Sequence, residues 1–231
     1  MTRPIVALDV PTADAARRIV ADLGDACDFY KVGLQLFAAE GPAIVRWLRE
    51  QGKSVFVDLK AHDIPNTVRG VAASVAALGA SLFTVHGSGG EAMVRAAVEG
   101  AAAVPGSQCG VLVVTVLTSF DAATYAEAAG RDSVDVTAEV LRLADIADRA
   151  AAKGVVCSGR EASAVRDRFA QLEVLVPGVR SAGGATQDQA RVVTASQAAR
   201  AGAAYVVLGR AVTASSDPAG ALRAMARELG A

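Results

Sequence analysis

Four ionisable side chains lie within six residues in the segment DLKAHD, at Asp58, Lys60, His62 and Asp63. They follow SVFV, an apolar run typical of a buried strand. Because side chains alternate along a strand, Asp58 and Lys60 should point to the same face. An ammonium held beside carboxylates can stabilise a developing negative charge and donate a proton to it. The segment therefore indicates electrostatic and acid–base catalysis.

Two further charges lie at the ends of other apolar runs. Asp9 is near the end of the first run and Lys31 near the end of the second. Only four lysines occur against nineteen arginines, so a lysine at a strand end is more informative than an arginine would be. Opposite charges would keep the lysines protonated and the carboxylates ionised at neutral pH. Such an amine does not suit a Schiff base, which needs it neutral.

A structural network of salt bridges is the alternative explanation of these charges. For one aspartate or lysine alone, that explanation would be preferred. Four charges converging on one end of neighbouring strands favour chemistry, because each is costly to remove from water and pairing offsets that cost only in part.

Eight short apolar runs alternate with longer, alanine-rich segments of helical period, as in strand–helix units. The runs are residues 4–10, 28–33, 54–60, 81–87, 109–119, 154–159, 173–180 and 204–210. We expect one (β/α)8 TIM barrel, an α/β fold, spanning residues 1–231 as a single domain. A doubly wound open sheet is the alternative. It is disfavoured because ALDVPTADA follows the first run, where a glycine-rich dinucleotide fingerprint would lie.

The helical segments carry start and stop signals. TADAARRIVADLG begins with a residue suited to an N-cap and ends at Gly24. We expect a helix near residues 135–152, and the gap at 120–134 has room for a short extra helix.

Two arginines follow the last two runs. Arg180 ends the seventh run, before a glycine-rich segment and a helix carrying Gln189, while Gly209 and Arg210 end the eighth. Barrels often bind phosphate between the loops after these two strands, and arginines would add charge-assisted contacts. Either arginine alone is better explained as surface charge. The small residues 181–186 are typical of a lid.

Composition excludes several classes of function. A formal net charge of −1 with interspersed signs gives no basic patch for nucleic acid, and no apolar run approaches the length of a membrane span. The segment MTRPIVALDV reaches a strand too early to include a signal peptide, so we expect a cytoplasmic protein with a small-molecule partner. With two histidines and three scattered cysteines, we expect no metal site and buried thiols rather than disulfides.

Short motifs distributed along the chain point to one family. ALDV, YKVG, DLKAHDIPNT, VLTS, PGVR and VLGRAV occur in this order between residues 7 and 212. Together they resemble the orotidine 5′-phosphate decarboxylases of the short bacterial type, and D-x-K-x-x-D followed by I-P-N-T is the most specific part. The resemblance implies cofactor-independent decarboxylation of orotidine 5′-phosphate to uridine 5′-phosphate, in de novo pyrimidine biosynthesis.

The resemblance also implies roles for individual residues. Lys60 matches the proton donor, with Asp58, Asp63 and Lys31 as its catalytic neighbours. The positions that match substrate contacts are Asp9, Lys31, Asp58, Thr67, Thr118, Arg180, Gln189, Gly209 and Arg210. The pyrimidine contact is Thr118 or its neighbour Ser119. In this family Asp63 and the region of Thr67 reach into the partner's site, which implies a homodimer with shared active sites.

Two positions depart from the family pattern. Ala61 stands where an aromatic residue is common, and Ser181 stands where proline often follows the phosphate-binding arginine. These departures bear on packing and on lid rigidity rather than on the chemistry.

Two rival functions remain open at this point. A metal-dependent relative with the same D-x-K-x-x-D core, such as a keto-gulonate phosphate decarboxylase, would need additional acids at the strand ends. A nucleotide-binding regulatory barrel without turnover would not need such costly charges.

Overall fold

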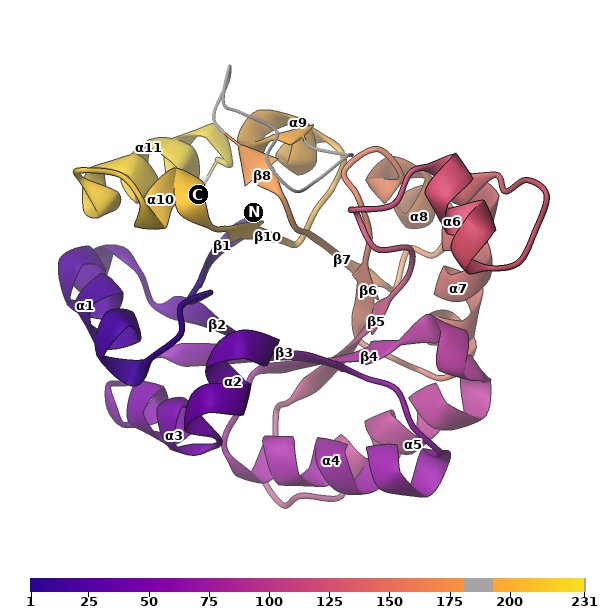
Figure 1. Ribbon diagram of the computed structural model, residues 1–231, viewed down its shortest axis with the longest axis horizontal. Helices are drawn as coiled ribbons and strands as arrows, with labels where there is room; N and C mark the ends of the chain where they lie inside the picture. The colour runs from indigo at the N-terminus through magenta and orange to yellow at the C-terminus, as the bar shows by residue number, and fades with distance from the viewer. Residues whose placement is uncertain (181–192, 231) are drawn as a thin grey trace.

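The computed structural model describes residues 1–180 and 193–230, and its strands form a closed parallel barrel surrounded by helices (Figure 1). In order around the barrel the strands are β1 (Arg3–Ala7), β10 (Tyr205–Leu208), β7 (Glu173–Val176), β6 (Gly154–Val156), β5 (Gly110–Val114), β4 (Leu82–His86), β3 (Ser54–Ala61) and β2 (Phe29–Gly33). The predicted (β/α)8 barrel is therefore confirmed.

The helices lie on the outside of the barrel and follow the predicted segments closely. They are α1 (Ala13–Leu23), α2 (Leu34–Glu40), α3 (Ala43–Glu50), α4 (Pro65–Ala77), α5 (Gly90–Ala102), α6 (Ala122–Ala128), α7 (Val136–Arg149), α8 (Ala162–Arg168), α9 (Ala195–Arg200), α10 (Arg210–Thr213) and α11 (Pro218–Glu228). The short extra helix expected between residues 120 and 134 is α6. Within the described ranges, no helix combines the length and the apolar character that crossing a bilayer requires.

Several of the barrel strands, among them β1, β5 and β7, end earlier than their apolar runs suggest. Strand β5 ends at Val114 because its neighbour β6 offers no partner beyond Val156. Strand β7 ends before Pro177, which has no N–H to donate to the ladder. Strand β1 ends at Ala7. The polar residues that follow these strands therefore lie in loops at the rim of the barrel.

Arg180 is not at the end of a barrel strand, contrary to the expectation from sequence. It belongs to β8 (Val179–Arg180), which pairs in parallel with β9 (Val193–Thr194) in a separate two-stranded sheet. The chain leaves the barrel at Pro177, three residues before Arg180. The expected lid at 181–186 lies outside the described residues.

Apolar side chains fill the middle of the barrel. Inward-pointing residues of alternating position form one compact cluster, made of Ile5, Ala7, Phe29, Phe56, Leu82, Leu112, Leu175 and Val207. A second, larger cluster joins the outer face of the barrel to the helices and includes Cys27 and Cys157. All three cysteines are free thiols; Cys27 and Cys157 are buried, whereas Cys109 is only partly buried. Substrate chemistry is thus confined to the two ends of a filled barrel.

The amino-terminal end of the barrel is closed by paired polar and aromatic side chains. The guanidinium of Arg3 lies 4.6 Å from the ring centre of Phe29 and bonds Asp28 at 2.7 Å. Phe29 meets Tyr205 edge to face, with ring centres 6.2 Å apart. Beside them Lys153 and Glu173 form an ion pair at 2.9 Å. Such contacts at this end are typical of stability rather than catalysis.

Helices α4 and α5 pack unusually closely. A Cβ atom on Gly100, inside α5, would overlap the backbone oxygen of Arg69 on α4. Gly100 thus allows an approach that alanine would prevent. Gly70, one residue further along α4, is exposed, and a Cβ there would meet nothing within 4 Å.

These two glycines give a test of the packing. We expect Gly100→Ala to destabilise the fold by about 1–3 kcal/mol despite the better helix propensity of alanine, because the two backbones must separate. The matched variant Gly70→Ala should stabilise it by roughly 0.5–1 kcal/mol. Urea denaturation of both variants measures the difference. Equal stabilisation by the two substitutions would contradict the close packing.

Candidate functional site

A cavity of about 520 Å³ opens at the carboxyl-terminal end of the barrel strands. Its floor is the apolar cluster of the barrel interior, through Phe56, Leu175 and Val207. Polar residues at the strand ends form its walls. They are Asp9, Lys31, Asp58, Lys60, Thr118, Ser119 and Arg210. The cavity is where a (β/α)8 enzyme places its active site.

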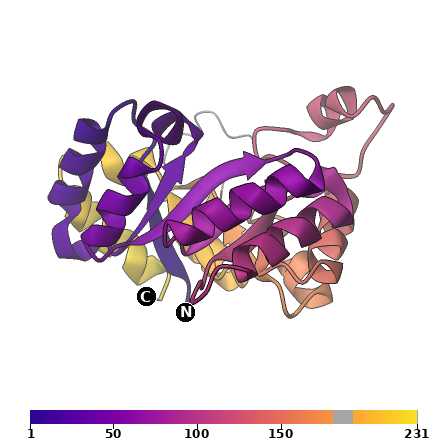
Figure 2. The same ribbon diagram turned by 90° about the horizontal axis from the view of Figure 1, so that it is seen from below.

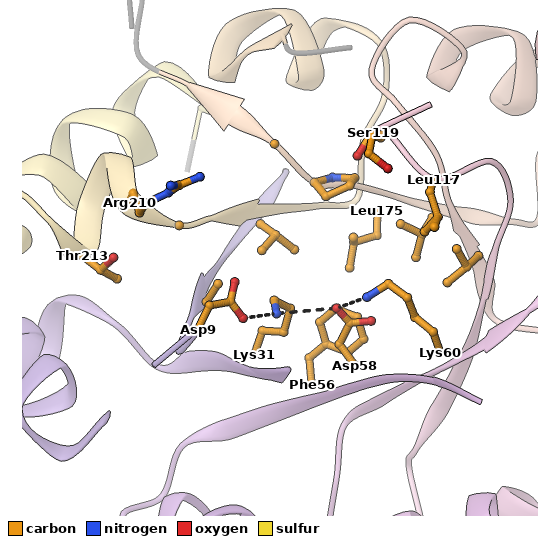
Figure 3. A pocket seen from close by; sticks show the side chains of 18 of the residues that line it. Asp9, Lys31, Phe56, Asp58, Lys60, Leu117, Ser119, Leu175, Arg210 and Thr213 are labelled. Atoms are coloured by element: carbon orange, nitrogen blue, oxygen red, sulfur yellow. Dashed lines mark hydrogen bonds and ion pairs between the residues drawn. The ribbon is translucent and has the colours of Figure 1, made fainter. Parts of the chain in front are cut away.

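Four charged side chains form a continuous row along one wall (Figure 3). Lys31 Nζ lies 2.7 Å from Asp9 Oδ1 and 3.6 Å from Asp58 Oδ2. Lys60 Nζ donates to the same Oδ2 of Asp58 at 2.9 Å. Charges therefore alternate from Asp9 through Lys31 and Asp58 to Lys60. The predicted convergence of these residues from three neighbouring strands is confirmed.

Burial differs along the row. The side chains of Lys31 and Asp58 are only 9% and 11% exposed, whereas Asp9 and Lys60 are 59% and 36% exposed. Burial alone would raise the pKa of Asp58, but Lys31, Lys60 and the hydrogen bonds that Asp58 accepts outweigh it and hold that pKa below its usual value. Asp58 is therefore ionised at neutral pH. The row has a fixed, buried centre, and Lys60 faces the cavity.

Lys60 reaches this position through a bulge in β3. Val57 pairs with Phe83 and Ala61 with Val85, so four steps along β3 match two along β4. Within the bulge Lys60 has φ +51°, the left-handed conformation that residues other than glycine rarely adopt. The strict alternation expected from sequence is thus interrupted, although Asp58 and Lys60 still meet. Bulges that re-aim a side chain are common beside active sites.

Thr84 on β4 is a residue of this site that the sequence analysis missed. Its hydroxyl donates to Asp58 Oδ1 at 2.9 Å and accepts from the backbone N–H of Lys60 at 2.9 Å. A weak signal was present. Thr84 is the one hydroxyl residue in the apolar run LFTV, in phase with Leu82, which points into the barrel.

The motif YKVG is explained by the ion pair beside it. A Cβ atom on Gly33 would lie 2.7 Å from both Asp9 Oδ1 and Lys31 Nζ. A larger residue would force the two charged groups to move from the positions that they occupy here. Gly33 is therefore needed for close approach rather than for an unusual backbone conformation.

The other predicted site residues are distributed as follows. Thr118, Ser119, Gly209 and Arg210 line the cavity, with Thr118 and Ser119 in the loop after β5 rather than in the strand. Arg210 and Ser119 lie across the cavity from the charged row (Figure 3). Gln189 lies outside the described residues, and of Arg180 only the backbone is described.

Asp63 and Thr67 lie outside the cavity of their own chain. Both are exposed, Asp63 between β3 and α4 and Thr67 in the first turn of α4. Neither lines the cavity.

The two histidines are neighbours but do not make a metal site. The rings of His62 and His86 lie 5.7 Å apart. Burial lowers the pKa of His86, as do the nearby His62 and Lys60, while Asp58 opposes them. Among residues 1–180 and 193–230, no three histidine, cysteine, aspartate or glutamate side chains are grouped as metal ligands.

The segment after Thr118 is tied down by a buried carboxylate. Helix α6 extends beyond the rim of the barrel, on the side away from the two termini (Figure 2). Behind it, Glu139 of α7 accepts hydrogen bonds from Tyr125 at 3.1 Å and from Arg142 at 2.7 and 3.0 Å, and pairs with Arg131 at 3.4 Å. Glu139 thus links the middle of α6, and the segment just after it, to α7.

A closed (β/α)8 barrel with alternating charges in a cavity at the strand ends is the architecture of an enzyme. Comparison with known proteins supports this class. The family model for the orotidine 5′-phosphate decarboxylase / HUMPS family matches residues 2–225. The chain belongs to this family.

Individual relatives agree. An orotidine 5′-phosphate decarboxylase of Anaeromyxobacter dehalogenans is 52% identical over 98% of both chains. One from Moorella thermoacetica is 44% identical over 97% of this chain and 91% of its own. The crystal structure of orotidine 5′-phosphate decarboxylase from Lactobacillus acidophilus superimposes with a TM-score of 0.88, at 34% identity, and covers both chains completely. The resemblance seen in the sequence motifs is therefore confirmed.

The Glu139 network gives a prediction for the stability of the α6 segment. The hydrogen bonds from Arg142 lower the pKa of Glu139 to about 2. A carboxyl whose pKa is lower in the folded state contributes stability above its unfolded pKa and loses it as the pH falls. We expect Glu139→Gln to reduce the free energy of unfolding by about 1–3 kcal/mol at pH 7. The deficit should shrink steadily below about pH 4.5.

Urea denaturation at pH 7 and pH 3.5 measures this effect. The control is Glu127→Gln, because Glu127 is an exposed residue of α6. It should change the free energy of unfolding by less than about 0.5 kcal/mol at either pH. A pH-independent deficit in Glu139→Gln would show that the carboxylate is not held ionised by its partners.

Proposed function

We propose that this chain catalyses the cofactor-independent decarboxylation of orotidine 5′-phosphate to uridine 5′-phosphate, a step of pyrimidine biosynthesis, with Lys60 as the proton donor. The observation that carries the mechanism is the row of alternating charges from Asp9 to Lys60 in the cavity. The observation that carries the substrate is the likeness to the decarboxylases named above. A cytoplasmic location, expected from the sequence, belongs to the same proposal.

The reaction needs a cation at one carbon atom. When the bond between ring carbon six and its carboxylate breaks, carbon dioxide leaves and the electron pair stays in the plane of the ring. The pyrimidine offers no electron sink comparable to pyridoxal phosphate. The charge must therefore be stabilised where it forms, by a group already in place.

Lys60 meets this need at the exposed end of the row. Its ammonium, held by Asp58 at 2.9 Å, faces the cavity. It stabilises the carbanion and then transfers a proton to ring carbon six, after which the amine regains a proton from water. Asp58 fixes the ammonium and, as an ionised neighbour, repels the substrate carboxylate before it leaves.

The phosphate of the substrate belongs on the other side of the cavity. Gly209 and Arg210 lie there, at the start of α10. From the sequence, Arg180 and Gln189 are expected to join them. Binding energy from a group remote from the reacting bond can hold the charges aligned and so raise turnover.

The exposed segment before α4 supports a homodimer. Ile64 in this segment is 66% exposed, and Leu34, the first residue of α2, is 65% exposed, unusual values for large apolar side chains. Ile64 lies beside Asp63, the last residue of the D-x-K-x-x-D motif, which does not line its own cavity. A second copy of the chain would cover the apolar side chains and receive Asp63 and Thr67 in its site.

A metal-dependent relative and a regulatory barrel remain the rivals of this proposal. Both are addressed by following the absorbance of orotidine 5′-phosphate with the purified protein, with and without a chelator. We expect loss of substrate at the same rate in both samples. Inhibition by the chelator would favour the metal-dependent relative, and tight binding of uridine 5′-phosphate without turnover would favour the regulator.

The same assay tests the role of Lys60. We expect Lys60→Ala to lower kcat by roughly 10⁴-fold or more, because it removes both the electrostatic stabilisation and the proton donor. The variant should keep its affinity for uridine 5′-phosphate within about tenfold of the wild-type value, a change of at most about 1.4 kcal/mol in binding free energy. Retained turnover in a folded Lys60→Ala protein would rule out the assigned donor.

Shared sites predict complementation between two inactive variants. Lys60→Ala and Asp63→Asn should each be severely impaired alone. Co-expressed, they should regain about a quarter of wild-type activity, because half of the randomly formed dimers are mixed and each mixed dimer has one intact site. No recovery in mixed dimers, confirmed by mass spectrometry, would place Asp63 in its own chain's site or outside catalysis.

A further inference from the structure

Thr84 lies on β4 opposite the bulge in β3, where the charged row meets the barrel interior. Its side chain is completely buried and does not line the cavity. One hydroxyl group nevertheless contacts two parts of the site. It donates to the carboxylate of Asp58 and accepts from the backbone N–H of Lys60. The residue can therefore act on the site without touching a ligand.

The contact gives the two carboxylate oxygens of Asp58 different partners. Oδ1 of Asp58 accepts from Thr84, while Oδ2 faces both ammonium groups, Lys60 at 2.9 Å and Lys31 at 3.6 Å. A carboxylate free to rotate would present either oxygen to the lysines. The hydroxyl fixes the rotation of Asp58 and so the point at which both cations converge.

The same hydroxyl replaces a hydrogen bond that the bulge removes. Between the pairs Val57–Phe83 and Ala61–Val85 the regular ladder is interrupted. The N–H of Lys60 is directed to Thr84 instead, at 2.9 Å. A left-handed residue other than glycine costs on the order of 1–3 kcal/mol and persists only where its surroundings hold it. Through this hydrogen bond, Thr84 helps to keep Lys60 in its left-handed conformation.

Only a hydroxyl can fill this role in the available space. A backbone N–H can only donate and an ionised carboxylate can only accept. The atom between them must accept from the first and donate to the second. Valine has nearly the same shape as threonine but can do neither, whereas serine can do both.

We propose that Thr84 is a positioning residue of the active site, which sets the orientation of the Asp58 carboxylate and the left-handed backbone of Lys60 and thereby the place of the Lys60 ammonium. The inference rests on the proposed function and adds to it a residue that does not contact substrate. It differs from a purely structural role, in which the hydroxyl would stabilise the fold without affecting the chemical step.

Three variants separate the two roles. Thr84→Val removes the hydroxyl and keeps the shape. Thr84→Ser keeps the hydroxyl. Thr115→Val is the matched control, because Thr115, the residue directly after β5, is buried, donates its hydroxyl to the backbone oxygen of Val156 on β6 at 2.8 Å, and does not bond the charged row.

Steady-state kinetics with orotidine 5′-phosphate, calorimetric binding of uridine 5′-phosphate and thermal unfolding are measured for all three variants and the wild type. We expect Thr84→Val to lower kcat by about 10- to 100-fold, the usual effect of misplacing a reacting group by about an ångström. Its affinity for uridine 5′-phosphate should stay within about threefold, since Thr84 does not line the cavity. Thr84→Ser should restore kcat to within about threefold of wild type.

The control decides between positioning and stability. Thr115→Val should lower the unfolding temperature to a similar extent and leave kcat unchanged. Wild-type kcat in Thr84→Val, or an equal loss of kcat in Thr115→Val, would overturn the inference. If Thr84→Val does not fold, Thr84→Cys takes its place, because a thiol is only a weak donor and acceptor.

A crystal structure of Thr84→Val keeps this test separate from that of the proposed function. If the wild type itself does not turn over orotidine 5′-phosphate, the proposed function fails. The inference about Thr84 is then judged by geometry alone. We expect Lys60 to leave the left-handed conformation and its Nζ to shift relative to Asp58, and an unchanged Lys60 would overturn the inference.

Discussion

The site depends on keeping one carboxylate ionised inside a protein wall. Asp58 is buried, and burial favours its neutral form. Two ammonium groups and two hydrogen bonds reverse that preference, so the charge stays. The lysines in turn depend on the carboxylate, because Lys31 is buried and Lys60 is held by Asp58 at 2.9 Å, and a charge removed from water is costly without a counter-ion. The four charges from Asp9 to Lys60 are therefore one unit, and removing any member changes the state of the others.

The barrel makes this unit possible by bringing distant residues together. Lys31 on β2 and Asp58 and Lys60 on β3 come from adjacent strands, and Asp9 follows β1, which pairs with β2. Parallel strands end at a common rim, so residues more than twenty positions apart in sequence become neighbours. Gly33 leaves the space that the Asp9–Lys31 ion pair occupies. Thr84, on the adjacent strand β4, donates a hydrogen bond to Asp58. The fold thus supplies geometry, and a few small residues refine it.

Much of this arrangement could be predicted from sequence, because strands and helices each leave their own period in the pattern of apolar residues. Spacing of apolar runs indicated eight strand–helix units, and the position of Asp9, Lys31, Asp58 and Lys60 at run ends indicated the cluster. The bulge at Lys60 could not be predicted, since alternation assumes a regular strand. Nor could the partners of Glu139, which depend on how α6 folds back on α7. Arg180 was misplaced because the run at 173–180 was taken as one strand, although Pro177 inside it ends β7 and the residues after it form a second small sheet.

The closed amino-terminal end of the barrel has a consequence for molecular traffic. The contacts of Arg3, Phe29 and Tyr205 and the pair Lys153–Glu173 lie at that end, and the buried apolar cluster fills the barrel between them and the cavity. In the described part of the chain, the cavity therefore opens at the carboxyl-terminal rim of the barrel and not at the opposite end. In the proposed reaction, carbon dioxide and uridine 5′-phosphate would both leave through this opening. The order in which they leave would then depend on how tightly the residues at the rim bind the nucleotide, because the two products have no separate routes.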